Sequence, residues 1–553
     1  MASFGDGEDA GPLKLSLESR SCPQSPLRVS KTSLLSQTVE AEDDPTKVDA
    51  VPSWDGFSAE QVFASPGSRG YTFDDLIVLP GSIDFGVDDV NLTTRITKKL
   101  CLNMPFCSSP MDTVTEEKMA IAMALQGGIG FIHCRSKIED QVAMVRDVKR
   151  FENGFINNPV CMSPTDLVSD MDTLKDDKGI TGVPVTIDGK MGSRLVGFVG
   201  KRDTDFIEDR NIALSDVMTP ASAVATTLHP CTLEEVNVKM MADKVSYLCV
   251  VDGEGNLKSL TTRSDLKKNR DYPNQCKNAL GQLVCGAAVS ASASDVIERA
   301  GALATAGVDV IVIDSRNGDT QEQLDVLAWL KANHPSVEVI AGNVAVVGQV
   351  RKLLDAGADG LRVGMGVGSV STSQNVKAVG RAQLSAVYHC AKLAAQYDVP
   401  VIADGGIGNT GAAIKALTMG ASCVMMGSLL AGVEESPGQY FFENNMRLKA
   451  YRGMGSLHSR KLNSDAASPE DDIVVNTGVT GAVVDKGTMM KFMPYFAQSV
   501  RHGLQDMGIS SLPQLRDGLY SGNLRFEIRS PNAQKEGGVH DLHSFTTKLF
   551  SSK

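Results

Sequence analysis

Closely spaced cysteine pairs are missing from this 553-residue sequence, although it contains eleven cysteines. The cysteines are scattered singly, and several lie inside apolar stretches such as Ser-Tyr-Leu-Cys-Val-Val. Without a CxxC pair or a dense cysteine framework, a disulfide-stapled or zinc-binding domain is disfavoured. The pattern instead indicates buried free thiols in a reducing compartment.

Long apolar runs and an excess of positive charge are missing as well. No apolar run reaches the roughly 18–20 residues that span a bilayer, and the N-terminus lacks a basic segment followed by an apolar one. The formal net charge of -12 disfavours binding to nucleic acid or anionic membranes, which requires a basic surface. We therefore expect a soluble cytoplasmic protein with no nucleic-acid or membrane partner.

Length and local composition divide the chain into parts. A chain of this length is expected to form two or more domains. Residues 1–60 are rich in Ser, Pro, Gly, Asp and Glu without a sustained apolar period, which predicts a disordered N-terminal extension. Residues 61–154 and 281–553 are predicted to form one domain, which residues 155–280 interrupt.

Short β-branched runs alternate with helical stretches, most regularly after Gly307, and this predicts parallel strands covered by helices. The expected strands are 129–133, 308–314, 337–343, 360–364, 399–406 and 423–428, and the expected helices include 115–125, 347–356 and 410–419. The runs after Gly307 end in polar or glycine residues, as at Asp314-Ser315 and Gly342-Asn343. Such strand ends are typical of an α/β (β/α)8 TIM barrel with its site on that face. A doubly wound open sheet is the alternative.

Residues 155–280 contain an internal repeat. In each of two units a β run, a glycine-containing turn and a second β run lead to an Arg-containing turn and then to Asp203 or Asp265 before a helix. The repeat resembles a pair of CBS modules (a Bateman domain), a family that binds adenine or guanine nucleotides. The resemblance implies that ATP or GTP binds here with its ribose on these two aspartates. The repeat is expected to enter the barrel after a strand and to leave it near Asn269.

The glycine-spaced loop at 362–376 is the strongest candidate for a ligand site. Gly364, Gly366 and Gly368 lack Cβ atoms, so a phosphate, a sugar or a cation can approach the backbone closely. An unliganded surface turn is the other interpretation of this loop taken alone. Similar glycine-rich strand ends follow it along the chain, and these favour the ligand site.

Several motifs together resemble the inosine-5′-monophosphate dehydrogenase family from about residue 57 to the C-terminus. They are Ser108-Ser-Pro-Met-Asp-Thr-Val, Gly127-Gly-Ile-Gly-Phe-Ile-His, Asp404-Gly-Gly-Ile, Met426-Gly-Ser-Leu-Leu and Tyr451-Arg-Gly-Met-Gly-Ser. The resemblance implies oxidation of IMP to XMP with NAD. The family uses a loop cysteine as nucleophile, potassium to order that loop, and an arginine on a mobile flap, here near 452–478, to help water hydrolyse the intermediate.

The resemblance also assigns the ligand contacts. Ser369, Gly406, Gly427 and Ser428 would bind the phosphate of an IMP, XMP or GMP type of nucleotide, and Asp404 would accept hydrogen bonds from its ribose diol. The segment Tyr451–Gly455 would hold phosphate and base from the other side. The full set of implied substrate-binding residues is Ser109, Met111, Ser369, Asp404, Gly405, Gly406, Gly427, Ser428, Tyr451, Arg452, Gly453, Met454, Gly455 and Thr477.

Cofactor and cation contacts follow from the same resemblance. The NAD side comprises Asp314, Ser315, Arg316, Asn343, Gly364, Met365 and Gly366. Arg316 stands where the family has a small hydroxyl residue, so it either clashes with the nicotinamide riboside, which weakens or abolishes NAD binding, or pairs with Asp314. Potassium would be held by carbonyls of Gly366, Gly368 and Ser371 together with Glu536, Gly537 and Gly538 of a neighbouring subunit. A shared site implies an oligomer, either a homotetramer or a hetero-oligomer with an active paralogue.

Two catalytic positions depart from the family pattern. The family reads Gly-Ser-x-Cys-x-Thr, whereas this chain reads Gly368-Ser-Val-Ser371-Thr-Ser373, so the nucleophile position is a serine. A serine hydroxyl needs an adjacent base, whereas a cysteine is partly thiolate at neutral pH. The flap arginine falls near Asp465 in an acidic stretch, and its Gln or Glu partner aligns with Thr477.

Three functions remain open from the sequence. The first is a pseudoenzyme: an IMP-dehydrogenase-like protein that holds purine nucleotides with little or no turnover and acts through co-assembly. The second is an active IMP dehydrogenase with an atypical site, in which Ser371 attacks weakly or Cys134 replaces it. The third is a nucleotide sensor that works through the CBS pair alone.

Overall fold

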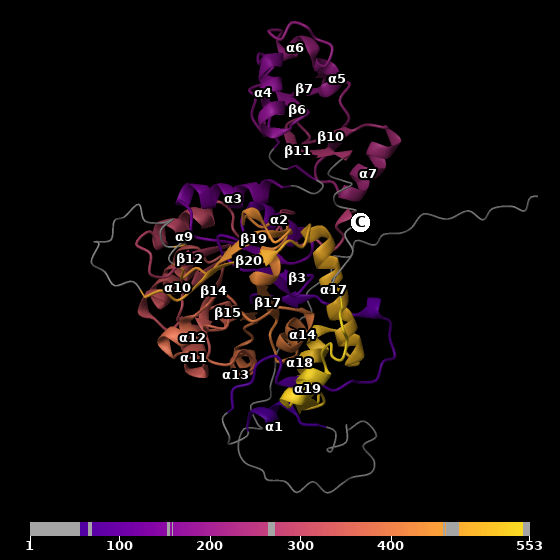
Figure 1. Ribbon diagram of the computed structural model, residues 1–553. Helices are drawn as coiled ribbons and strands as arrows, with labels where there is room; N and C mark the ends of the chain where they lie inside the picture. The colour runs from indigo at the N-terminus through magenta and orange to yellow at the C-terminus, as the bar shows by residue number, and fades with distance from the viewer. Residues whose placement is uncertain are drawn as a thin grey trace, which may run out of the picture.

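The computed structural model describes residues 56–64, 69–151, 155–156, 159–263, 271–456, 459 and 475–545 (Figure 1). The predicted extension at 1–60 lies almost wholly outside these residues, and so do Asp265 and Asp465. The interrupted domain is the lower body in Figure 1, and the insertion stands above it.

Parallel strands close into a barrel in the order β12-β13-β14-β15-β16-β17-β4-β5, so the predicted (β/α)8 fold is confirmed and the open doubly wound sheet is excluded. The strands are apolar on both faces because side chains fill the barrel interior and helices cover the outside. Their bounds are β4 (Phe106–Ser108), β5 (Ile129–Ile132), β12 (Gly286–Ser290), β13 (Val310–Asp314), β14 (Glu338–Val344), β15 (Gly360–Val363), β16 (Val401–Asp404) and β17 (Cys423–Met426).

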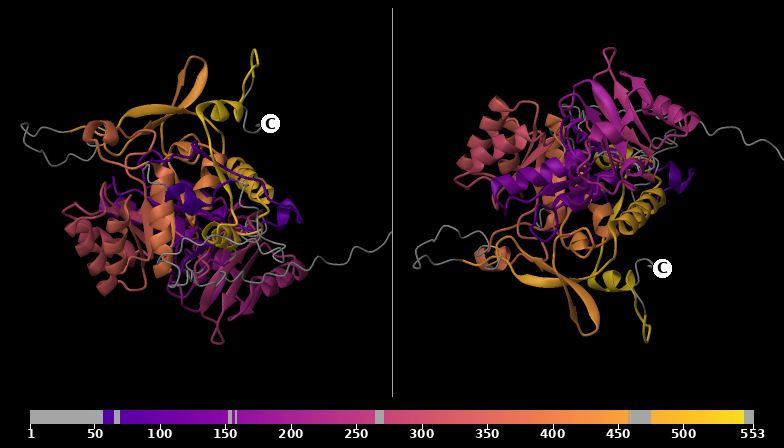
Figure 2. Two further views of the ribbon diagram at one scale, coloured as in Figure 1. Left: turned by 90° about the horizontal axis from the view of Figure 1, so that it is seen from below. Right: turned by 90° about the horizontal axis from the view of Figure 1, so that it is seen from above.

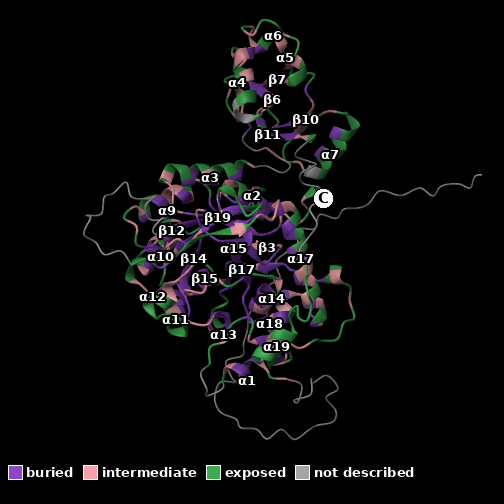
Figure 3. Cartoon of the chain, viewed as in Figure 1, coloured by how far each residue is buried: buried purple, intermediate pink, exposed green. Residues whose placement is uncertain are grey.

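Helices between the strands form the outer layer of the barrel, whose centre is buried in Figure 3 while the outer helix faces are exposed. They are α2 (Glu117–Leu125), α3 (Ile138–Arg150), α9 (Val296–Thr305), α10 (Gln321–Asn333), α11 (Val347–Asp355), α13 (Gln383–Ala394) and α14 (Thr410–Thr418). In α11 the buried residues Val350, Leu353 and Leu354 follow the three-and-four spacing of an amphipathic helix. Asn409 caps α14 by accepting a hydrogen bond from the Ala412 amide at 2.8 Å.

The insertion contains two three-stranded sheets, each built on an antiparallel hairpin. One has β6 (Gly182–Thr186), β7 (Leu195–Gly200) and β8 (Thr219–Pro220), and the other has β9 (Thr226–Leu228), β10 (Tyr247–Val251) and β11 (Leu257–Thr262). Short helices accompany them: α4 (Val168–Lys178), α5 (Lys201–Thr204), α6 (Leu214–Val217) and α7 (Leu233–Ala242). The Leu195 amide donates to Gly255 and the Leu257 amide to Ser193, each at 3.0 Å. These reciprocal bonds join the two units as a pair.

The expected entry point of the insertion was wrong, because the chain leaves the barrel after helix α3 and not after a strand. Val142, Val145 and Val148 are buried on one face of α3, so this helix completes the β5 unit of the barrel. Asp203 also lies inside the short helix α5 and not before a helix.

The chain after β17 adds a second sheet and further helices. After α15 (Ser428–Ala431), strands β18 (Tyr440–Glu443), β19 (Met446–Arg452) and β20 (Thr480–Val484) pair antiparallel. The two views of Figure 2 place the β18–β19 hairpin and the insertion on opposite sides of the barrel. Other elements outside the barrel strands are α1 (Ala59–Phe63), the paired strands β2 (Thr94–Arg95) and β3 (Cys101–Leu102), the short helix α12 (Ser373–Lys377), α17 (Met489–Asp506), α18 (Leu512–Ser521), β21 (Phe526–Ile528), which pairs with β1 (Leu76–Val78), and α19 (Pro531–Glu536).

Nine cysteines in the described part of the chain are free, and six of these are buried. Cys101 departs from the expected pattern because it is disulfide-bonded. Within the same residues, no helix is long and apolar enough to cross a membrane.

Candidate functional site

A buried arginine joins the ends of three barrel strands. Arg362 on β15 is 6% exposed, and its Nη1 donates to Asp314 Oδ1 at 2.7 Å while its Nε donates to Asp404 Oδ2 at 2.9 Å. Burial alone would lower the pKa of Arg362, but Asp404 and Asp314 outweigh it and raise that pKa. Asp314 and Asp404 were expected to contact different ligands, and one guanidinium now connects them.

Asn343 extends this polar array at the end of β14. Its Nδ2 donates to Asp404 Oδ2 and to the Gly364 carbonyl, each at 2.8 Å. Its Oδ1 is buried without a hydrogen-bond partner among the described residues. Ser315 lies close by and donates to the Gly342 carbonyl at 2.9 Å. An unpartnered acceptor at a strand end fits a ligand that brings its own donor, such as a carboxamide.

Two glycines bring the loop after β15 against the end of β16. Gly364 has φ of +146°, and a Cβ there would lie 1.9 Å from the Asp404 carbonyl oxygen. Gly405 has φ of +100°, and a Cβ there would lie 3.3 Å from the Gly368 amide nitrogen. Side chains at these positions would force the loops apart. At Gly368 a Cβ would meet no atom within 4 Å, so the backbone there is open for a ligand.

Tyr451 lies next to the residues that were expected to hold the phosphate. Burial raises its pKa to about 12, although hydrogen bonds with the Ser369 side chain and the Ser428 backbone act in the opposite direction. Its Oη lies 3.7 Å from Met111 Sδ, and a Cβ on Gly427 would lie 2.8 Å from that Oη. The phenol is therefore a neutral group at physiological pH, placed among both candidate phosphate-binding serines.

Ionic and backbone contacts hold the segment after Tyr451. Arg452 Nε donates to Asp112 Oδ2 at 2.8 Å, and Arg135 Nη2 donates to the Met454 carbonyl at 3.3 Å. Ser109, two residues before Met111, donates its amide to Met426 at 3.1 Å. The motifs around Ser109, Gly427 and Tyr451 thus meet at one end of the barrel.

Glycines let this segment pack against the glycine-spaced loop. The Gly453 amide donates to Val479 at 2.9 Å, and a Cβ on Gly453 would lie 2.8 Å from the Val370 carbonyl. A Cβ on Gly455 would lie 2.6 Å from Thr477 Oγ1 and 3.5 Å from Arg316 Nη2. Arg316 therefore reaches across to the Gly455 segment, while the cation that pairs with Asp314 is Arg362.

Ser371 has a neutral environment. Its Oγ lies 2.9 Å from Ser373 Oγ and accepts a hydrogen bond from the Ser373 amide at 3.4 Å. Among the described residues, no histidine, lysine or carboxylate is hydrogen-bonded to it. The loop is held from the other side, because the Thr372 amide donates to the Thr477 carbonyl at 3.0 Å.

Cys134, the alternative nucleophile, is unsuited to attack. Burial first, and then the charge of Asp314, raises the pKa of its thiol to about 11. A thiol with that pKa is almost wholly protonated at neutral pH, and the thiolate is the nucleophilic form.

The expected cation ligands lie in two separate segments of the chain, the loop after β15 and the end of α19. The carbonyls of Gly366 and Ser371 accept no hydrogen bond from the described residues, whereas the Gly368 carbonyl accepts one from the Ser371 amide at 3.0 Å. Carbonyl oxygens with free lone pairs suit a hard cation. Glu536 ends α19, where the Gly537 amide donates to Ala533 and the Gly538 amide to Lys535. No described contact connects Glu536–Gly538 to the loop within this chain.

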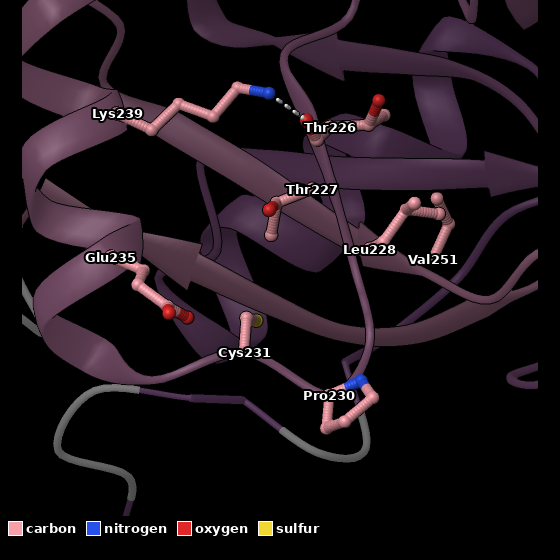
Figure 4. Close-up of a pocket in the computed structure, with 8 residues that line it drawn as sticks. All are labelled: Thr226, Thr227, Leu228, Pro230, Cys231, Glu235, Lys239 and Val251. Atoms are coloured by element: carbon pink, nitrogen blue, oxygen red, sulfur yellow. Dashed lines mark hydrogen bonds between the residues drawn. The ribbon is translucent and has the colours of Figure 1, made fainter.

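The insertion has fewer candidate ligand contacts than the barrel among the described residues. Asp203 Oδ2 accepts the Gly200 amide at 2.8 Å, so this carboxylate caps α5. A separate hollow of about 360 Å³ lies in the second unit between β9 and α7, and Figure 4 shows its lining. Its lining residues are Thr226, Thr227, Leu228, Pro230, Cys231, Glu235, Lys239 and Val251, and they do not include Asp203. Lys239 Nζ donates to the Thr226 carbonyl at 2.6 Å along one side of it.

Sequence reasoning missed Arg362, Arg135 and Asp112 as parts of this site. Arg362 carried a signal, since it is a lone charge within the apolar run Gly360-Leu-Arg-Val. Inward-facing charges in barrel strands need partners at neighbouring strand ends. Arg135 contacts the Met454 carbonyl, which is distant in the sequence, and no local sequence pattern predicts such a contact.

Comparison with known proteins gives a consistent result. The model of the IMP dehydrogenase / GMP reductase domain matches residues 70–540. Inosine-5′-monophosphate dehydrogenase of Toxoplasma gondii is 46% identical over 522 residues, which cover 84% of this chain and 94% of the relative. The enzyme of the same name from Trypanosoma brucei brucei is 43% identical over 503 residues, covering 90% and 98%.

A solved structure agrees with these relatives. The crystal structure of a cysteine-to-alanine variant of Trypanosoma brucei GMP reductase, in complex with guanosine 5′-monophosphate, superposes with a TM-score of 0.79 at 31% identity. The match covers 87% of this chain and 99% of that chain. The chain described here belongs to the IMP dehydrogenase / GMP reductase family.

Proposed function

We propose that this protein binds IMP-type purine nucleotides at the carboxyl end of its barrel but catalyses the oxidation of IMP to XMP poorly or not at all. The observation that carries the proposal is Ser371, whose hydroxyl has Ser373 as its only side-chain partner among the described residues. The family membership and the GMP bound to the structural neighbour support the choice of a purine nucleotide of guanine nucleotide synthesis.

The residues that the proposed nucleotide site requires are present. The Ser369 and Ser428 groups around Tyr451, with the open backbone at Gly368, suit a phosphate dianion, because hydroxyls and amides are its usual donors. Asp404 has one carboxylate oxygen engaged by Arg362 and Asn343, which leaves Oδ1 to accept from a ribose diol. Tyr451 donates a neutral hydroxyl, so it adds no charge that would repel the phosphate.

The step that would form a covalent bond to the purine lacks a base that could accept the proton of the nucleophile. Attack by Ser371 Oγ would require loss of its proton, and Ser373 is another neutral hydroxyl that cannot retain it. The flap position expected to carry arginine reads Asp465, and its partner position is Thr477. Both the formation and the hydrolysis of an intermediate are therefore impaired.

NAD is proposed to bind with reduced affinity, and potassium is proposed to bind at the loop carbonyls. Asp314, Asn343 Oδ1 and the Gly364–Gly366 backbone fit the polar groups of NAD, which would supply the hydride acceptor when bound. Arg316 weakens this binding by reaching toward Gly455. The carbonyls of Gly366 and Ser371, which accept no hydrogen bond from the described residues, would hold potassium. Glu536–Gly538 of a second subunit would complete the site in a homotetramer or in a hetero-oligomer with an active relative.

An active dehydrogenase with an atypical site is the second candidate, because the polar array of Asp314, Asn343, Arg362 and Asp404 is intact. The two candidates share nucleotide binding and differ in turnover. A sensor that acts through the CBS pair alone would bind ATP or GTP but not IMP. Asp203 and Asp265 are the proposed ribose contacts of that regulatory nucleotide.

The proposal is tested by titrating the purified protein with IMP, ATP and GTP and then measuring NADH production with IMP, NAD and potassium. Saturable IMP binding that Asp404→Ala removes, together with little NADH, is expected. Turnover at an ordinary dehydrogenase rate would favour the second candidate. Absence of IMP binding with retained ATP or GTP binding would favour the sensor.

A further inference from the structure

Arg362 connects two carboxylates that serve different ligands in the proposed function. Asp314 lies on the expected cofactor side and Asp404 on the nucleotide side, and the guanidinium donates to both. The side chains of Arg362 and Asp404 are 8% and 16% exposed, so water competes little for these bonds. A guanidinium is planar and presents its donors in a fixed fork, so it holds two acceptors at a fixed relative angle.

The hydrogen bonds at Asp404 leave one oxygen available. Oδ2 accepts from Arg362 Nε at 2.9 Å and from Asn343 Nδ2 at 2.8 Å. Oδ1 has no partner among the described residues, and it is not sealed off from solvent. The two bonds to Oδ2 therefore fix the rotation of the carboxylate and determine the direction in which Oδ1 points.

We propose that Arg362 is a positioning residue through which Asp314 controls the affinity of the nucleotide ribose site on Asp404. Asp314 fixes the guanidinium through Nη1, and the guanidinium fixes the Asp404 carboxylate through Nε. Asp314 acts without touching the nucleotide, so the cofactor side and the nucleotide side are thermodynamically coupled. The inference rests on the proposed function, because it assumes that Asp404 accepts the ribose hydroxyls.

The sign of the effect separates this coupling from plain electrostatics. Removal of the Asp314 charge by a through-space effect would make the barrel end less negative and would tighten binding of a phosphate dianion. Loss of the positioning contact lets Arg362 and the Asp404 carboxylate rotate, which weakens ribose binding. The two effects therefore predict opposite changes in IMP affinity.

The test compares IMP with 2′,3′-dideoxy-IMP, which lacks both ribose hydroxyls, by calorimetry or equilibrium dialysis on the full-length protein. For Asp314→Ala we expect IMP affinity to fall about tenfold, in the range of couplings within one hydrogen-bond network. The dideoxy nucleotide should change less than about twofold, because it does not use Asp404. Asp314→Asn keeps an acceptor for Arg362 Nη1 and should restore part of the IMP affinity.

Asp319→Asn is the matched control. Asp319 lies in the segment between β13 and α10 but pairs with Lys352 at 2.8 Å, a lysine that is 60% exposed, and it makes no hydrogen bond or ion pair with Arg362 among the described residues. It should leave the affinity of both nucleotides unchanged. Unchanged or tighter IMP binding in Asp314→Ala, or an equal loss for both nucleotides, would overturn the inference. Absence of IMP binding by the unmodified protein would instead refute the proposed function, on which the inference depends.

Discussion

Replacement of Arg362 by methionine tests how the buried ion network holds the barrel end. Arg362 is 8% exposed in its side chain and donates to Asp314 at 2.7 Å and to Asp404 at 2.9 Å. The substitution keeps an unbranched apolar side chain but leaves two nearby carboxylates without their shared cation. Removing one partner of a buried ion pair typically costs about 3–5 kcal/mol, because the remaining charge is uncompensated.

Arg95→Met is the matched control for this prediction. Arg95 pairs with Asp398 at 2.5 Å, but the side chains are 20% and 51% exposed. Exposed ion pairs contribute about 0–1 kcal/mol to stability. The Arg95→Met variant should therefore unfold at a urea concentration close to that of the unmodified protein. Urea unfolding of the three proteins, followed by near-ultraviolet circular dichroism, measures the difference. Equal unfolding midpoints for Arg362→Met and Arg95→Met would refute the reasoning.

Three further predictions concern single side chains. Tyr451→Phe removes the hydroxyl near Ser369 and Ser428 and should weaken IMP binding by about 1–1.5 kcal/mol, roughly tenfold, measured by calorimetry. Ser371→Cys alone should not restore full turnover in an NADH assay, because the proposed flap position, near Asp465, has no arginine. Full recovery would contradict the proposed loss of that arginine. Burial lowers the pKa of Lys486 to about 8, below its unfolded value, so the unfolded chain binds the extra proton above pH 8 and stability should rise with pH between about 8 and 10.5. Lys486→Met should abolish that rise in unfolding experiments across this pH range.

The barrel was predictable because its signals are local. Strands such as β13 and β17 are buried on both faces and therefore appear as continuous β-branched or apolar runs ending in glycine or polar residues. Predicted and observed strand ends differ by at most two residues, since turn residues and glycines mark them. The helix α3 lies inside the predicted barrel segment 61–154, but it was not predicted as a helix, so the insertion was expected to follow a strand instead.

Contacts between distant segments were less predictable. The resemblance brought Ser109, Ser369 and Tyr451 together through motifs, but no sequence pattern indicated that Arg362 bridges Asp314 and Asp404. The three-stranded sheet β18–β20 was not predicted either, because β18 and β20 are exposed and lack a buried apolar period. Long-range hydrogen bonds and ion pairs depend on the closure of the barrel, which brings residues together that are far apart in the chain.

Single-turnover kinetics test the central claim most directly. The protein, at a concentration above that of NAD, is mixed with saturating IMP and potassium, and NADH formation is followed in a stopped-flow fluorimeter. In the mechanism that the resemblance implies, hydride transfer precedes the hydrolysis of the intermediate, so this measurement isolates the step proposed to depend on Ser371. We expect saturable IMP binding, measured in parallel by calorimetry, without a burst of NADH. A burst stoichiometric with the bound NAD would contradict it.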